Sequence, residues 1–223
     1  MVMALGLLLG ALLSTGTPAS AATTSGKAYA WGDNTYGQLG NGTNDPKDVP
    51  VQVKKLTDVK AISAGCDHNL ALKKDGSVWA WGFGTNGELG NGSRASRNVP
   101  VKVASLGTGV RRVAAGYYFS LALMNDGTVR SWGYNYYGEL GDGTYGPSAS
   151  KATPVAVKDL SGVRALATDS SAEHVLALLD DGTVRAWGYN YYGQLGDGTW
   201  LNFRVTPVAV TDLTGVTQVA VAR

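Results

Sequence analysis

The sequence predicts an all-β fold, a β-propeller of four-stranded antiparallel blades. A Trp-Gly pair followed by Gly-Gln-Leu-Gly or Gly-Glu-Leu-Gly recurs along the chain, with its tryptophan at Trp31, Trp81, Trp132 and Trp187. A period of about fifty residues is typical of stacked units that each bury an apolar face against a neighbour. Short segments of alternating hydrophobicity and Gly-rich turns lie between these pairs, as expected of strands. Four-stranded units that recur in this way indicate propeller blades.

The N-terminal segment differs from the repeats. Residues 1–13 are apolar and are followed by the small residues Ala19-Ser20-Ala21, as in a signal peptide that is cleaved after Ala21. The apolar run is shorter than a membrane span of about 20 residues, and no Lys or Arg precedes it. We therefore expect residues 1–21 to be a signal peptide and 22–26 a linker. The mature protein would then be secreted, with no membrane association after cleavage.

The clearest repeat gives the order of strands within a blade. Strands are expected at 110–115, 119–124, 129–132 and 153–157. The second and third are joined through Asp126-Gly127, for which we expect a type I′ hairpin turn. The last contains Pro154, which suits an outer edge strand because a proline has no N–H to donate. The same pattern predicts whole blades at 59–103, 110–157 and 163–210.

The predicted propeller is incomplete, with three full blades and partial ones at each end. The propeller segment is 27–223, with sequence repeats near 27–77, 78–128, 129–183 and 184–223. It would begin with the third strand of a blade at 28–31 and end with a first strand at 215–223. A blade formed by joining the two ends would therefore lack its second strand. A chain cut from a longer gene, a dimer that closes one ring from two arcs, and an open, self-associating arc all fit this count.

The repeated motifs resemble the regulator of chromosome condensation repeat. They are Val-x-x-Trp-Gly-x-Asn-x-x-Gly-Gln/Glu-Leu-Gly, Pro-Val-x-Val and Gly-x-x-His-x-Leu-Ala-Leu, and they recur in register from Lys27 to Arg223. The resemblance implies a propeller, usually of seven blades, and this chain is identified as a partial, secreted bacterial-type member. The motif histidine is His68 in one repeat and His174 in another, but Phe119 stands between them. A position that accepts Phe is expected to be structural.

No set of side chains in the sequence resembles an assembled catalytic, cofactor or metal site. Cys66 is a single cysteine and is expected to be buried. The run from Gly82 to Gly87 spells G-x-G-x-x-G, but no helix follows to hold a pyrophosphate. The two histidines have no further ligands beside them. Asp142 and Asp197 each offer one carboxylate, which leaves calcium binding open. We therefore expect no enzymatic activity, no cofactor and no metal.

The loops that follow the third strand of each repeat form the candidate binding surface. They should emerge on one rim of the propeller, and Tyr, Asn and Gly together are typical of binding surfaces. We expect Tyr36, Tyr137 and Tyr192 to pack on a neighbouring blade. The candidate binding residues are Tyr134, Asn135, Tyr136, Tyr189, Asn190, Tyr191, Phe83, Asn34 and Trp200. The longer connections add Tyr145, Leu201, Phe203 and Arg94 as second candidates.

These observations predict a secreted, non-catalytic propeller that binds a protein partner. The resemblance adds an inhibitor-like role, because some secreted bacterial propellers of similar repeats inhibit β-lactamases. The nucleotide-exchange activity of the best-known family member is not expected here, since no segment resembles a GTPase-contacting insertion. A carbohydrate-binding module and a carbohydrate-active enzyme are the alternatives. A net charge of +2 argues against a nucleic-acid partner.

Overall fold

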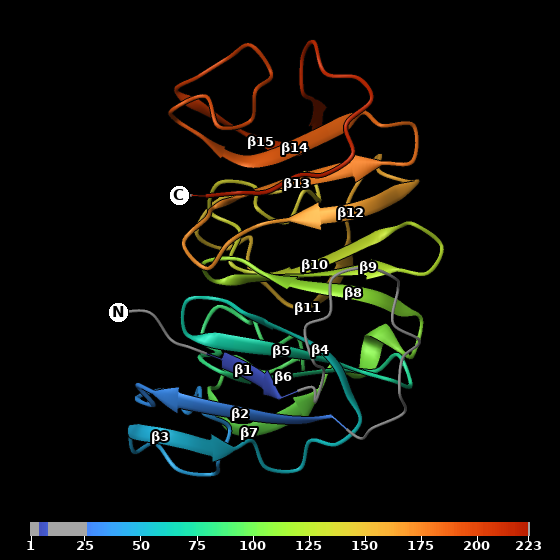
Figure 1. Ribbon diagram of the computed structural model, residues 1–223. Coiled ribbons are helices and arrows are strands. Elements are labelled where there is room, and N and C mark those ends of the chain that lie inside the picture. The colour runs from blue at the N-terminus through green and yellow to red at the C-terminus, as the bar shows by residue number, and fades with distance from the viewer. Residues whose placement is uncertain (1–4, 9–25, 223) are drawn as a thin grey trace.

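The strands form four antiparallel sheets that are arranged side by side in an arc (Figure 1). The computed structural model describes residues 5–8 and 26–222. Three of its sheets are four-stranded meanders, and no α-helix occurs in the described part of the chain. The predicted fold class, an incomplete β-propeller, is therefore confirmed. We number the sheets along the chain as the first to the fourth blade.

The three meanders have closely similar strand bounds. The second blade contains β4 (Val59–Ala64), β5 (His68–Lys73), β6 (Val78–Gly82) and β7 (Arg97–Lys102). The third contains β8 (Val110–Ala115), β9 (Phe119–Met124), β10 (Val129–Gly133) and β11 (Lys151–Ala156). The fourth contains β12 (Val163–Ala167), β13 (His174–Leu179), β14 (Val184–Asn190) and β15 (Asn202–Ala209). A short 3-10 helix at Ala104–Leu106 joins the second blade to the third.

The first blade differs from the expected half-blade. Its strands β2 (Lys27–Gly32) and β3 (Lys47–Gln52) are joined by β1 (Leu5–Leu8), which pairs antiparallel with β2. This strand takes the place of the second strand that we expected to be missing. Apart from Leu5–Leu8, the predicted signal peptide lies outside the described residues, as does the predicted linker apart from Gly26.

The predicted first strand at 215–223 is wrong over the residues that the structure describes. Residues 216–222 form no strand. Val216 still donates its N–H to the main-chain oxygen of Gly182 at 3.0 Å, and an Arg164 guanidinium nitrogen lies 3.0 Å from the Val216 oxygen. Within the described part of the chain no second strand lies beside this segment to complete a ladder, which is why it runs along the fourth blade as irregular backbone.

The Asp-Gly turns between the second and third strands also differ from the expectation. A type I′ turn needs a positive φ at both central residues. Gly127 has a φ of +78°, whereas Asp126 is not among the residues with positive φ. Asp126 instead accepts hydrogen bonds from the Thr128 N–H at 2.9 Å and the Thr128 hydroxyl at 2.7 Å. The turn is therefore not of type I′, because only Gly127 has a left-handed backbone conformation.

The Trp-Gly pairs mark the point where each third strand bends into its loop. In the third blade the register between β10 and β11 shifts between Ser131 and Gly133, and Gly133 has a φ of +103°. A Cβ on Gly133 would lie 2.6 Å from the main-chain oxygen of Tyr118. Gly82 and Gly188 lie at equivalent bulges with similar φ values. Only glycine allows both this φ and this close approach.

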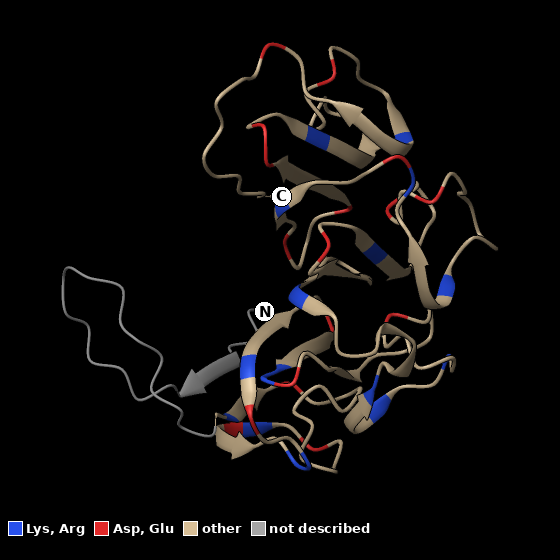
Figure 2. Ribbon diagram, turned by 90° about the vertical axis from the view of Figure 1, so that its right-hand side faces the viewer, with Lys and Arg blue, Asp and Glu red and all other residues tan. Residues whose placement is uncertain are grey.

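The hydrophobic core lies between neighbouring blades. Trp81, Trp132 and Trp187 are fully buried, and each belongs to a separate cluster formed by residues of two adjacent blades. Each blade therefore depends on its neighbour to bury its apolar faces, as expected of a repeat array. Lys and Arg residues occur on strands and connections alike (Figure 2). No helix among the described residues is long and apolar enough to cross a bilayer.

Candidate functional site

Two kinds of loop leave the blades at the same end. Because each blade is a meander, the connection from first to second strand and the connection from third to fourth strand lie on one side. We call these the inner and outer loops, and the surface that they form together the loop face. The inner loops are 65–67, 116–118 and 168–173, and the outer loops are 33–46, 83–96, 134–150 and 191–201.

Main-chain hydrogen bonds fix the inner and outer loops to each other. The Tyr134 N–H donates to the main-chain oxygen of Tyr118 at 2.9 Å, and the Tyr189 N–H donates to that of Glu173 at 2.9 Å. Between blades, the Tyr117 N–H donates to the Ala172 oxygen at 3.1 Å. The side chains on the loop face are therefore held by backbone that is bonded within and between blades.

The first group of aromatic side chains crosses three blades. Tyr36 contacts Phe83 of the second blade with ring centroids 4.8 Å apart, and Phe83 contacts Tyr118 of the third blade at 5.3 Å. Tyr118 in turn lies 4.1 Å from Tyr117. The expectation that Tyr36 packs on a neighbouring blade is confirmed. Phe83, a predicted binding residue, lies half-buried between two tyrosines.

The second aromatic group joins the third and fourth blades. Two pairs of tyrosine rings are stacked, Tyr134 on Tyr136 at 6.3 Å within an outer loop, and Tyr189 at the end of β14 on Tyr191 of the following outer loop at 6.0 Å. Tyr137 bridges the two loops, with its ring edge-on to Tyr189 at 4.9 Å. This confirms the expected packing of Tyr137 on a neighbouring blade. Because Tyr134 is bonded to Tyr118 through the main chain, the two aromatic groups adjoin.

The exposed members of these groups are those that a partner can reach. Tyr136 is 41% exposed and Tyr191 is 47% exposed, whereas their stacking partners are half-buried. Trp200 is also exposed, near the end of its outer loop. Tyr192 is exposed too, and it contacts Tyr191 and Tyr189 of its own blade, since the structure describes no later blade for it to pack on.

The asparagines of the outer loops do not belong to this accessible surface. Asn34, Asn135 and Asn190 are fully buried. The Asn135 side-chain oxygen accepts the Leu140 N–H at 3.0 Å, and its amide nitrogen donates to the Thr144 main-chain oxygen at 3.0 Å. Asn34 and Asn190 make equivalent bonds in their own loops. We therefore remove these three residues from the candidate surface, because their side chains hold the loops in shape.

The loops also bury two glutamates. Glu88 and Glu139 are fully buried, at the position that is occupied by Gln38 and Gln194 in the other repeats. The Glu139 carboxylate accepts the Tyr137 N–H at 2.9 Å. Burial raises the pKa of Glu88 to about 7 and that of Glu139 to about 8. Burial thus favours the neutral form of both carboxyl groups, which agrees with the uncharged glutamine at this position in the other repeats.

His68 lies inside the joint between the second and third blades. Its Nε2 lies 2.9 Å from the hydroxyl of Ser120, and that hydroxyl donates to the main-chain oxygen of Glu88 at 2.9 Å. Because the Ser120 hydroxyl already donates its proton to Glu88, it accepts a hydrogen bond from Nε2 of the neutral His68 ring. Burial lowers the pKa of His68 to about 4. These contacts agree with a structural role for the motif histidine.

The remaining reactive groups lack the surroundings that chemistry would need. Cys66 is half-buried, less buried than expected, and burial raises its pKa, whereas a nucleophilic thiol needs a lowered one. Among the described residues, no three His, Cys, Asp or Glu side chains gather as metal ligands. The Asp142 and Asp197 carboxylates accept hydrogen bonds from Thr144 and Thr199, respectively, and shape their own turns.

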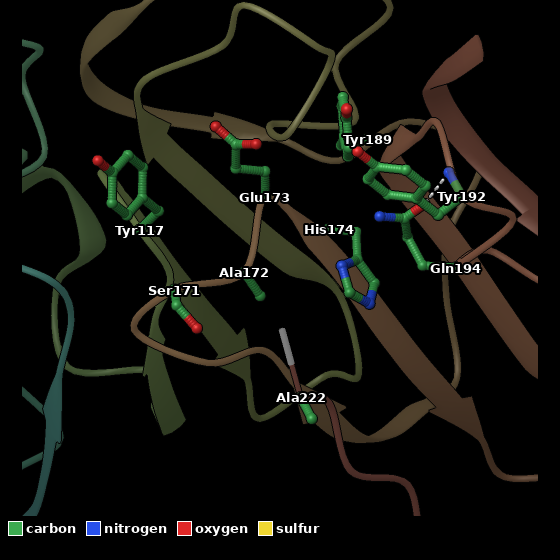
Figure 3. A pocket seen from close by; sticks show the side chains of 9 residues that line it. All are labelled: Tyr117, Ser171, Ala172, Glu173, His174, Tyr189, Tyr192, Gln194 and Ala222. Atoms are coloured by element: carbon green, nitrogen blue, oxygen red, sulfur yellow. Dashed lines mark hydrogen bonds between the residues drawn. The ribbon is translucent and has the colours of Figure 1, made fainter. Parts of the chain in front are cut away.

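An open cavity of about 720 Å³ lies beside the second aromatic group. Figure 3 shows the Glu173 carboxylate between Tyr117 and Tyr189, with His174 to one side, near Gln194. The predicted site residues do not include Tyr117, Tyr118 or Glu173, because the prediction was based on the outer loops alone. Strand order alone could have found them, since in a meander the inner loops emerge at the same end.

Comparisons with known proteins agree with this architecture. The family model described as RCC1-like domain matches residues 11–223. The chain is 38% identical over 208 residues to the E3 ubiquitin-protein ligase HERC2 of Homo sapiens, which is 90% of this chain and 4% of HERC2. It is 33% identical over 209 residues to the ultraviolet-B receptor UVR8 of Arabidopsis thaliana, which is 92% of this chain and 47% of UVR8.

Solved structures of similar proteins share the fold. Prp20p of Saccharomyces cerevisiae superposes with a TM-score of 0.69 at 25% identity, over 84% of this chain and 47% of Prp20p. Human WBSCR16 superposes with a TM-score of 0.70 at 24% identity, over 83% of this chain and 49% of that one. The chain thus spans less than half the length of each of these proteins. The match to the family model, together with the repeated Trp-Gly pairs, shows that the chain belongs to the RCC1-like domain family.

Proposed function

We propose that this chain is a non-catalytic module that binds a protein partner through the loop face. The observation that supports this most is the aromatic surface, which is fixed by main-chain bonds yet presents Tyr136 and Tyr191 to solvent. Rigid aromatic side chains at partial exposure are typical of the residues that carry binding energy in protein interfaces. Chemistry has less support, because the buried ionisable groups are bonded within the loops and joints.

The relatives add support of a general kind. Prp20p was studied for its binding to Gsp1p and histones, and yeast RCC1, also named Prp20, was solved bound to Kap60. These partners belong to those proteins, and we take from them only that the fold is used to bind other proteins. The apolar N-terminal segment is the basis for proposing export, in which cleavage after Ala21 would remove β1 from the first blade. We therefore place the partner outside the cell and propose that the module acts by occupying it, as an inhibitor does. N-terminal sequencing of protein recovered from a culture medium tests the export.

Affinity capture with matched variants tests the binding. The double variant Tyr136→Ser and Tyr191→Ser removes two exposed rings without touching the buried ones. Leu213→Ser is the control, because Leu213 is also exposed but lies at the opposite end of the blades. We expect partners cross-linked to the wild-type chain to be lost with the double variant and kept with the control. Equal capture by all three proteins would contradict the proposal.

The same stacked tyrosines favour one second candidate, a carbohydrate-binding module. Exposed tyrosine rings such as those of Tyr136 and Tyr191 also suit stacking against sugar rings. A glycan array probed with the wild-type chain and the double variant separates the two functions. Retention of a glycan that depends on both tyrosines, without any captured protein, would favour carbohydrate.

A further inference from the structure

The loop face carries charged as well as aromatic side chains. Apart from the two buried glutamates, its inner and outer loops contain the acidic residues Asp33, Asp45, Asp67, Asp142, Asp169, Glu173 and Asp197, of which Asp197 pairs with Arg204 at 2.6 Å. Arg94 is the only Lys or Arg in these loops, all of which lie within the described residues. Arg94 donates to the main-chain oxygen of Ser150 at 2.8 Å and so braces two blades.

Basic residues compensate part of this charge at the same end of the blades. Lys47, Arg97 and Lys151 begin the fourth strands β3, β7 and β11, directly after the outer loops. The ammonium groups of Lys54 and Lys158 also reach the outer loops, since a Cβ on Gly42 would lie 3.2 Å from the first and a Cβ on Gly143 would lie 2.7 Å from the second. A preference for a cation must therefore come from a particular place on the loop face and not from its overall charge.

The cavity at Glu173 gives this preference a definite place. Its lining includes Tyr117, Glu173 and Tyr189 and contains no Lys or Arg. Burial lowers the pKa of His174, which also lines the cavity, and so disfavours a positive charge on its ring. In Figure 3 the Glu173 carboxylate lies between Tyr117 on one side and Tyr189 on the other. A carboxylate with aromatic rings nearby suits an organic cation, because negative charge and ring faces both attract it.

A second carboxylate lies within electrostatic reach of the first. Glu139 follows Tyr136 and Tyr137 in the outer loop of the third blade, and one of its oxygens has no hydrogen-bond partner in the described structure. After burial, the charge of Glu173 adds to the elevation of its pKa. A cation placed at Glu173 would relieve this repulsion, so cation binding and the ionisation of Glu139 would favour each other.

We propose that the Glu173 cavity receives an arginine side chain of the partner protein. This rests on the proposed protein-binding function and names the chemistry of the partner. Arginine fits better than lysine, because its planar guanidinium both stacks on a tyrosine ring and presents a donor pair to a carboxylate. Lysine offers a compact, strongly hydrated charge instead.

Peptide binding measured by calorimetry on the full chain tests the proposal. The probe is a flexible Gly-Ser peptide with three arginines, and the matched probes replace arginine by citrulline or by lysine. We expect the arginine peptide to bind more tightly than the lysine peptide, and the citrulline peptide, which has the same shape without the charge, to bind at least about 10-fold more weakly. Equal binding of the arginine and citrulline peptides would overturn the proposal.

Two variants that each remove one negative charge test whether the arginine peptide binds at Glu173. Glu173→Gln removes the carboxylate of the cavity, and Asp180→Asn makes the same charge change in an exposed turn at the opposite end. We expect the first to weaken the arginine peptide by about 3- to 10-fold and the second to change it less than about 2-fold. Equal effects would show a diffuse attraction and would overturn the cavity as the site. Circular dichroism melts confirm that both variants are folded.

The outcomes also separate this inference from the proposed function. If a partner is captured through Tyr136 and Tyr191 but binds equally well to Glu173→Gln, the function stands and the arginine site fails. If the arginine peptide binds at Glu173 but no protein depends on the tyrosines, the site stands as a cation site and the interaction function fails.

Discussion

The indole N–H of Trp132 donates a 2.7 Å hydrogen bond to the main-chain oxygen of Glu88, which belongs to the preceding blade. Trp81 makes the same bond to Gln38 at 2.9 Å, and Trp187 makes it to Glu139 at 2.9 Å. These three tryptophans therefore each bond to the Gly-Gln/Glu-Leu-Gly segment of the repeat before them. The two most regular motifs of the sequence, the Trp-Gly pair and the Gly-Gln/Glu-Leu-Gly segment, thus form one contact between adjacent blades, which we call the joint.

Replacing the tryptophan tests the strength of that joint. Trp132→Phe removes the indole donor and leaves a small cavity in the core between the second and third blades. We expect the free energy of unfolding to fall by about 2–4 kcal/mol. Urea denaturation measures it, and Trp200→Phe, in an exposed loop, should cost less than about 0.5 kcal/mol. Similar losses in both variants would mean that the bond adds no stability.

Two glycines with nearly the same φ have different neighbours, so replacing each by alanine separates the cost of backbone strain from that of a steric contact. Gly141 has a φ of +63° and Gly196 a φ of +61°. A Cβ on Gly141 would lie 3.0 Å from the Trp187 indole nitrogen, whereas at Gly196 it would meet only a Val210 methyl group, also at 3.0 Å. We expect Gly141→Ala to destabilise by about 2–4 kcal/mol and Gly196→Ala by about 1–2 kcal/mol. Faster hydrogen exchange of the Trp187 indole in the first variant alone would locate the damage at the joint.

The buried asparagine should act on stability and not on binding. Asn135→Ala leaves the Leu140 N–H and the Thr144 carbonyl without partners, which we expect to cost about 1–3 kcal/mol. Asn125→Ala, in an exposed turn, is the control and should melt like the wild type. Thermal melts measure the difference. Lost partner capture with an unchanged melting temperature would instead make Asn135 a contact residue.

Glu139 should make stability depend on pH. Its pKa is raised in the folded state, so the folded chain keeps a proton that the unfolded chain releases. Stability is therefore highest below the unfolded pKa of about 4.5 and falls as the pH rises through about 8. Glu139→Gln should stabilise the protein by about 1–3 kcal/mol at pH 8.5 and by much less at pH 4.5. Denaturation at both pH values measures this, and an equal effect at each would contradict it.

The repeat period and the turn residues were enough to predict the blades and their order. Trp-Gly pairs and Asp-Gly turns act locally, and local chemistry is what a single sequence displays. The joint between blades was not predictable in the same way, because Trp132 bonds to a main-chain oxygen that any residue at position 88 would supply. The place of β1 was missed for another reason, since its apolar residues read equally well as a signal peptide.

The candidate site was predicted in part. The exposed tyrosines followed from composition, but the burial of Asn135 depends on bonds to Leu140 and Thr144 that close the loop on itself. The cavity at Glu173 was missed because the residues that line it are far apart in the sequence. Glu173 and Asp67 come together with the outer loops only when three strands of each blade have paired.

The joint through a main-chain oxygen has a consequence for how such chains change over time. A repeat supplies an indole N–H that donates to the preceding repeat and a main-chain oxygen that accepts from the following one. Any residue can supply that oxygen, whatever its side chain. Copying or deleting one whole unit would leave compatible partners on both sides of the new boundary. The array can thus grow, shrink or be recombined by single genetic events, while its loops diversify freely.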